Sequence, residues 1–180
     1  VLERDTLLEA RKRILEKYST TDILINGAGG NSPYATTKLE ELNSENKDRL
    51  EDAFFGLKLE GFQKVFDLNF MGTLLPTMVF SEEMVRKGSG AIVNISSMNS
   101  YKPLTKIPAY SAAKSAINNF TEWLSVHFAK TGVRVNAIAP GFFLTNQNRF
   151  LLLDEKTNEL TERGKKIIAN TPMGKFGEPE

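Results

Sequence analysis

The sequence has 180 residues, of which 41% are hydrophobic and 25% are charged, as in a globular domain. Its net charge is +1, with acids and bases interspersed, so it offers no basic stripe for nucleic acid and no polybasic patch for a membrane. Cysteine is absent, which excludes a disulfide framework, a thiolate metal site and a cysteine nucleophile. We expect a cytoplasmic protein with a single domain over residues 1–180.

The predicted elements alternate between helix and strand along the chain. Apolar residues recur at helical spacing over residues 6–17, and short, largely apolar strands are predicted at residues 22–26, 91–95 and 133–139. Apolar strands separated by helices are typical of a parallel sheet that is buried on both faces. The sequence therefore predicts an α/β fold with a doubly wound, Rossmann-like parallel sheet.

Three longer segments connect these strands. Residues 31–58 are polar and weakly periodic, which predicts a long excursion. Residues 59–87 predict a long helix that Pro76 should kink, because proline removes a backbone donor. Residues 108–130 predict the other main helix, whose wide aromatic stripe, including Trp123, fits either a core or a subunit interface.

Both ends of the chain are expected to be cut. The sequence begins with Val1 and leads directly into a helix, and residues 177–180 read as the start of another helix. A dinucleotide-binding fold normally opens with a strand and a glycine-rich turn, followed by a residue that reads the ribose 2′ position. We find neither, so the fold should lack its first strands and its C-terminal end. The choice between NAD and NADP stays open.

The most informative chemistry lies at Tyr110 and Lys114, which are four residues apart and therefore neighbours on a helix surface. A free tyrosine has a pKa near ~10. A cation at about 4 Å contributes about 4 kcal/mol at an effective dielectric near 20, which corresponds to a downward shift of about three pKa units. Such a phenol suits general acid–base catalysis. Ser97, thirteen residues before the tyrosine, brings a hydroxyl from a strand end. With Ser97 at this distance, a catalytic pair is favoured over the alternative of a packed tyrosine beside a solvated lysine.

Two further motifs accompany these three residues. Asn26, Gly27, Ala28 and Gly29 follow the first strand with few bulky side chains, which allows the backbone to approach a ligand closely. Asn69 lies within a predicted helix, where asparagine has poor propensity and a functional reason would offset the cost. A plain turn and a buried, helix-bending asparagine are the alternatives.

In order and spacing these motifs, with Pro140, Gly141 and Thr145, resemble the short-chain dehydrogenase/reductases. The resemblance implies an NAD(P)-dependent oxidoreductase whose Tyr110 is the acid or base. It assigns catalytic roles to Asn69, Ser97, Tyr110 and Lys114, with Lys114 also holding the nicotinamide ribose. It places the cofactor against Asn26, Gly27, Ala28, Gly29, Ile95, Tyr110, Lys114, Pro140, Gly141, Phe143 and Thr145. The family commonly has a second asparagine where this chain has Gly27. A homo-oligomer, as a tetramer, is also implied.

The segments 96–99, 103–110 and 139–145 further resemble the sugar-acid branch of that family, which implies D-mannonate or D-fructuronate as substrate. A carboxylate needs a cation, and arginine binds carboxylates bidentately. Arg149 is the best placed candidate, with Lys102 and Lys106 as competitors. Ser97 should bind the substrate oxygen. Asn99 or Asn31 would bind substrate hydroxyls.

Other activities remain open on the sequence. A 3-ketoacyl thioester reductase or a gluconate 5-dehydrogenase of the same family would share the catalytic residues. A non-catalytic nicotinamide-binding sensor or scaffold is the alternative of another class, although all four catalytic positions are filled. His127, the only histidine, lies more than about four turns after Tyr110 and is expected to pack or face solvent. No metal site is predicted.

Overall fold

The computed structural model describes residues 1–146 and 148–179. The chain divides into two compact units, Val1–Ala139 and Pro140–Glu180. The single domain expected over residues 1–180 stays a prediction. The first unit contains the sheet and most of the expected site residues, and the second contains the residues that follow the last strand.

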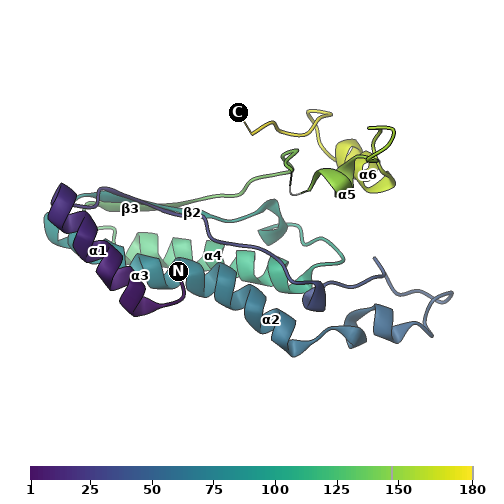
Figure 1. Ribbon diagram of the computed structural model, residues 1–180, viewed down its shortest axis with the longest axis horizontal. Helices are drawn as coiled ribbons and strands as arrows, with labels where there is room; N and C mark the ends of the chain where they lie inside the picture. The colour runs from purple at the N-terminus through teal and green to yellow at the C-terminus, as the bar shows by residue number, and fades with distance from the viewer. Residues whose placement is uncertain (147, 180) are drawn as a thin grey trace. The chain divides into compact units, whose positions relative to one another are not determined.

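The first unit is built on a three-stranded parallel sheet in the order β1-β2-β3, formed by Ile23–Asn26, Gly90–Ile95 and Val133–Ile138 (Figure 1). The predicted strands are confirmed, with each end within one residue. The register aligns Asn26 with Asn94 and Asn94 with Ala137. The carboxyl ends of all three strands therefore lie at one edge of the sheet. This is the edge at which open α/β folds bind ligands.

Helices α1 (Arg4–Tyr18), α3 (Gly72–Lys87) and α4 (Pro108–His127) cover one face of this sheet (Figure 1). Side chains from α3, α4 and all three strands form its core, among them the fully buried Met84 and Ile92. Burial of these apolar groups is the main force that holds the layers together. The Rossmann-like α/β fold expected from the sequence is confirmed.

The second face of the sheet differs from the prediction. Ile23 and Ile25 on β1 are 64% and 66% exposed, and Ile138 on β3 is 55% exposed. Successive side chains of a strand point to opposite faces, so the apolar runs predicted burial on both sides. Within the first unit, all of which is described, helices cover one face only (Figure 1). The expectation of two covered faces is therefore wrong for these residues.

The predicted helix over residues 59–87 is interrupted. It consists of α2 (Leu59–Phe66), the π-helical segment η4 (Asp67–Met71) and α3. The irregular turn contains Asn69, whose side-chain Nδ2 donates to the carbonyl of Val65 at 2.7 Å. A side chain that occupies a main-chain acceptor four residues earlier competes with the helical ladder. The departure from α geometry therefore falls at Asn69, and Pro76 lies buried inside α3.

Glycine ends α3 as predicted. Gly88 caps the helix with φ at 76°, in the left-handed region that side-chain-bearing residues rarely adopt. The excursion over residues 31–58 contains three short 3-10 turns, Pro33–Ala35, Leu50–Asp52 and Phe54–Gly56. This agrees with the absence of a periodic pattern there.

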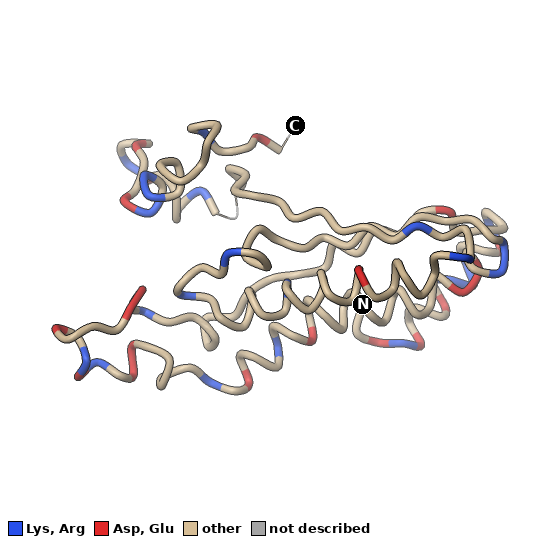
Figure 2. Tube along the Cα trace, turned by 180° about the vertical axis from the view of Figure 1, so that it is seen from behind, with Lys and Arg blue, Asp and Glu red and all other residues tan. Residues whose placement is uncertain are grey.

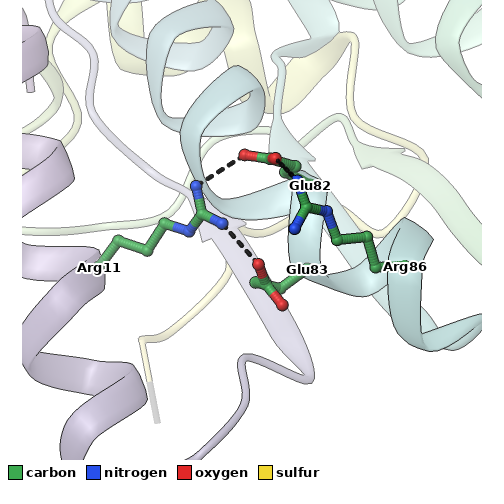
Figure 3. A network of polar contacts seen from close by, with 4 residues as sticks. All are labelled: Arg11, Glu82, Glu83 and Arg86. Atoms are coloured by element: carbon green, nitrogen blue, oxygen red, sulfur yellow. Dashed lines mark hydrogen bonds and ion pairs between the residues drawn. The ribbon is translucent and has the colours of Figure 1, made fainter.

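An ion-pair cluster fastens α1 to α3 (Figure 3). The Arg11 guanidinium on α1 contacts the carboxylates of Glu82 at 2.8 Å and Glu83 at 2.7 Å on α3. Hydrogen bonding from Arg11, with the charge of Arg86 nearby, holds the pKa of the Glu82 carboxyl below its usual value. Because one guanidinium bridges two carboxylates, the cluster fixes how α1 lies along α3.

The second unit contains two short helices, α5 (Arg149–Leu152) and α6 (Glu162–Ala169). The Thr161 hydroxyl caps α6 by accepting from the backbone N–H of Gly164 at 3.0 Å, a standard N-cap arrangement. Phe143 pairs with Gly177 through a parallel bridge. Neither helix was expected from the sequence.

Acidic and basic residues alternate along the chain without gathering by sign (Figure 2), as the composition indicated. Among the described residues, no helix has the length and apolar content needed to cross a membrane.

Candidate active site

The loop that follows β1 is held by Asn69. The Asn69 Oδ1 accepts from the backbone N–H of Gly30 at 3.2 Å, and its Nδ2 donates to the Gly30 carbonyl at 2.7 Å. The side chain is fully buried. One amide thus satisfies both backbone groups of a loop residue that no strand pairs. The structure places Asn69 as the clamp of the Gly27–Gly30 loop.

Gly29 lies where two other expected site residues, Asn69 and Lys114, approach each other. A Cβ on Gly29 would lie 2.8 Å from the Asn69 Oδ1 and 3.1 Å from the Lys114 Nζ. Both approaches are shorter than ordinary van der Waals contacts. The amide of Asn69 and the ammonium of Lys114 therefore face each other across the space that a Gly29 side chain would occupy. Gly27 differs, since the nearest atom to its hypothetical Cβ is the Ile95 Cγ1 at 4.0 Å.

Lys114 reaches from α4 to the end of β2. Its Nζ donates to the Ile95 carbonyl at 2.7 Å, and the residue is only 3% exposed. Burial lowers the pKa of the Lys114 ammonium to about 8, since a low dielectric disfavours the charged form. Around neutral pH the group is therefore still charged, yet close enough to its pKa to exchange protons.

Tyr110 lies one helical turn before Lys114. The Lys114 Nζ lies 5.6 Å from the centroid of the half-buried Tyr110 ring. The ring packs against a cluster that includes Val65, Ala109 and Ala113, which limits its rotamers. Tyr110 and Lys114 are thus brought together on one face of α4, as the four-residue spacing predicted.

Ser97 follows β2 and is 8% exposed. Its Oγ accepts from the backbone N–H of Asn99 at 3.2 Å, as the N-cap of the short turn Met98–Ser100. A hydroxyl that accepts one bond keeps its proton for another acceptor. The turn is fastened to α4, because Asn118 Nδ2 donates to the Ser100 Oγ at 2.8 Å. The structure therefore fixes the Ser97 hydroxyl at the end of β2, and its role toward the substrate stays a prediction.

Asn99 lies beside Ser97 but turns inward. The residue is 6% exposed, and its Oδ1 is buried without a hydrogen-bond partner among the described residues. Asn31 bonds the Thr36 hydroxyl at 2.8 Å. The Asn99 oxygen is therefore buried, whereas Asn31 is exposed and donates from its Nδ2, and the roles of both residues toward substrate hydroxyls stay predictions.

Asn26 also points into the protein. Its Nδ2 donates to the Thr77 Oγ1 at 2.9 Å and to the Asn94 Oδ1 at 2.8 Å, and the residue is 4% exposed. A side chain with this burial and these partners supports the sheet. The sequence analysis did not identify Thr77 and Asn94 as partners of Asn26. The asparagines at the ends of the first two predicted strands could have indicated the contact between Asn26 and Asn94.

The remaining expected cofactor residues belong to the second unit, as does Arg149. Thr145 and Phe143 are held by Asn148, whose Oδ1 accepts from the Thr145 N–H at 2.9 Å and whose Nδ2 donates to the Phe143 carbonyl at 2.7 Å. Pro140 is half-buried and Gly141 exposed at the start of this unit.

Arg149 lines a hollow of about 330 Å³ in the second unit, whose described lining residues are Asn146, Arg149, Phe150, Leu153, Asp154, Glu155 and Asn158. Its Nη2 donates to the Asn158 Oδ1 at 2.6 Å. Arg149 is the one basic group among these lining residues. The competing cations Lys102 and Lys106 lie in the first unit, between Ser97 and Tyr110.

His127 ends α4 on the surface, stacked on the Trp123 ring with centroids 4.8 Å apart. The packing role expected for it is confirmed. Within the part of the chain that the structure describes, no group of three or more His, Asp or Glu residues is placed to hold a metal ion.

Comparison with known proteins identifies oxidoreductases as relatives of this chain. The profile of the short chain dehydrogenases matches residues 1–156. An uncharacterized oxidoreductase of Haemophilus influenzae is 53% identical over all 180 residues, and the oxidoreductase UxuB of Bacillus subtilis, also uncharacterized, is 51% identical over the same length. The chain spans 62% and 63% of these relatives.

A solved structure is also similar. A candidate D-mannonate oxidoreductase, also from Haemophilus and crystallised with bound NAD, is 53% identical with a TM-score of 0.86. The match covers 98% of this chain and 62% of that one.

Proposed function

This chain belongs to the short-chain dehydrogenase family, and from that premise we propose that it is part of an NAD(P)-dependent oxidoreductase that interconverts a secondary alcohol and a ketone. One observation carries the proposal. A buried Lys114 ammonium lies beside the Tyr110 ring while Ser97 keeps a hydroxyl proton to donate.

In the proposed oxidation, Ser97 donates a hydrogen bond to the substrate oxygen and fixes its position. The Tyr110 phenolate takes the alcohol proton at its Oη, and Lys114 stabilises that phenolate as a cation held by the Ile95 carbonyl. A nicotinamide, if bound, would supply the acceptor for the hydride that leaves the alcohol carbon. In the reverse direction the Tyr110 phenol returns its proton to the oxygen as the hydride arrives.

The residues of the site fit a dinucleotide. Gly27 leaves open space at the carboxyl edge of the sheet, with no atom closer than 4.0 Å to the position of its Cβ. Backbone at such an edge can approach a ligand closely. Residues Gly27, Ala28 and Ile95 would line the cofactor, and Lys114 would hold its ribose. Pro140, Gly141, Phe143 and Thr145, which belong to the second unit, stay predicted cofactor contacts.

The proposed substrate is a sugar acid, and D-mannonate and D-fructuronate are the specific pair that we propose. The similar Haemophilus protein, a candidate D-mannonate oxidoreductase, supports this assignment. Arg149 is the proposed partner of the substrate carboxylate. Asp154 and Glu155, which line the same hollow, would accept hydrogen bonds from sugar hydroxyls rather than bind an acid.

The full-length protein tests the proposal directly. We expect reduction of NAD or NADP with D-mannonate, and oxidation of the reduced cofactor with D-fructuronate. D-gluconate and a 3-ketoacyl thioester are the control substrates for the two related enzymes. Faster turnover of either control than of D-mannonate would assign the protein to the substrate class of that control instead. Cofactor binding without turnover of any substrate would favour the non-catalytic sensor.

We further propose a cytoplasmic homotetramer. The absence of cysteine suits a reducing compartment. Trp123 and Val126 on α4 are 57% and 77% exposed, and Met78 on α3 is 58% exposed. Large apolar side chains exposed on two adjoining helices are typical of a subunit contact. Light scattering of the full-length protein should give four chains, and Val126→Glu should lower that number. A monomer in both would refute the assembly.

A further inference from the structure

The end of β2 is tied to α4 by three consecutive residues. Asn94 Nδ2 donates to the Thr121 Oγ1 at 2.9 Å, and the Ile95 carbonyl accepts from the Lys114 Nζ at 2.7 Å. Ser96 Oγ donates to the Lys114 carbonyl at 3.3 Å. The next residue is Ser97. The strand that delivers the serine hydroxyl is therefore bonded at each step to the helix that carries the lysine.

The outermost of these ties belongs to a buried polar network. Asn26 on β1 donates hydrogen bonds to Thr77 on α3 and to Asn94 on β2. Asn94 in turn donates to Thr121 on α4. Thr121 in turn donates to the Ile117 carbonyl at 2.7 Å. All four side chains of the network are at most 6% exposed. Bonds in such an environment are strong, and an orphaned partner is costly.

We propose that Asn94 and Thr121 are positioning residues that set the distance between α4 and the end of β2, and so hold the Lys114 ammonium against the Ile95 carbonyl. Thr121 lies seven residues after Lys114 on the same helix, two turns away and on the same face. Neither residue touches the reacting groups. Their effect on the reaction passes through Lys114. This inference rests on the proposed function for its relevance to catalysis.

The surroundings of Lys114 make its titration a sensitive reporter. Among the described residues, the groups that face it are Tyr110 on its own helix, the Ile95 carbonyl on β2 and the Asn69 amide on η4. None of them is a carboxylate. Burial alone lowers the lysine pKa, to about 8. If α4 moves away from β2 and water enters, that pKa must rise toward its ordinary value.

Thr121→Val removes the acceptor of the Asn94 amide and keeps the shape of the side chain. Thr77→Val is the matched control, because it removes an equally buried hydroxyl of the same network on the opposite side of Asn26. Thr121→Ser restores the hydroxyl. In each full-length variant the Lys114 ammonium is titrated by the NMR shift of its 13C-labelled Cε, without cofactor, and folding is checked by thermal unfolding.

We expect the Lys114 pKa to rise by at least about half a unit in Thr121→Val. It should stay at the wild-type value in Thr121→Ser and Thr77→Val. An unchanged pKa in folded Thr121→Val, or an equal rise in Thr77→Val, would show that the network supports the fold only. Because the titration needs no substrate, failure of the sugar-acid panel would leave this result standing and would count against the proposed function alone.

Discussion

Gly29 offers a sharp test of how the site is assembled. Replacing it with alanine adds a methyl group that would lie 2.8 Å from the Asn69 Oδ1 and 3.1 Å from the Lys114 Nζ. Neither neighbour is a free side-chain end. Asn69 is fastened at Gly30 and Val65, and Lys114 at the Ile95 carbonyl. The clash must therefore displace the clamp or the catalytic ammonium.

Overpacking of this kind typically costs about 1–3 kcal/mol. If the displacement falls on the reacting geometry, turnover should decrease roughly 5- to 150-fold, since each ~1.4 kcal/mol corresponds to a factor of ten. Gly72→Ala is the matched control outside the proposed site, because its Cβ would meet no atom closer than 3.4 Å. The assay is the steady-state kcat of full-length protein with saturating cofactor.

We expect Gly72→Ala to keep nearly the wild-type rate while Gly29→Ala loses most of it. Equal rates for the two alanine variants would show that Asn69 and Lys114 do not depend on the space beside Gly29.

Two other predictions concern the charged residues of the site. Burial lowers the Lys114 pKa to about 8, below the value near ~10.4 in an unfolded chain, so the unfolded state binds more protons between these values and stability must rise with pH there, by up to about 3 kcal/mol. Denaturant unfolding should show that rise in wild type and not in Lys114→Met, and parallel curves would contradict it. Arg149→Ala should lower catalytic efficiency on a sugar acid roughly 10- to 150-fold, through loss of a charge-assisted contact. Catalytic efficiency on a matched neutral polyol should fall much less. Equal decreases on both substrates would assign the carboxylate contact to Lys102 or Lys106 instead.

The fold was largely predictable because its signals are local. Short apolar strands, helical periodicity and the stop at Gly88 placed the sheet and the three main helices. A buried, helix-bending Asn69 was only the alternative interpretation, since the interruption depends on an amide that bonds a carbonyl four residues earlier and a loop 39 residues away. Periodicity carries no record of such a bond. The uncovered sheet face was missed for a related reason, because an apolar strand reads alike whether or not a helix covers it.

The proximity of Tyr110 and Lys114 was predictable from their spacing, because residues four apart on a helix are neighbours. Spacing could not predict the depth at which Lys114 is buried, or that the Ile95 carbonyl accepts a hydrogen bond from its Nζ. The role of Asn26 was also expected differently. Its position after a strand suggested a ligand contact, whereas its partners Thr77 and Asn94 come from elements distant in sequence.

In the proposed function, Tyr110 transfers the substrate proton with the help of Lys114. The most direct test is the kcat of full-length Tyr110→Phe, together with its cofactor affinity measured by fluorescence, because the change removes only the hydroxyl. We expect unchanged cofactor affinity and a ~10²–10⁴-fold lower rate, the range expected for loss of a general acid–base. A variant that binds the cofactor normally and keeps more than about a tenth of its rate would contradict it.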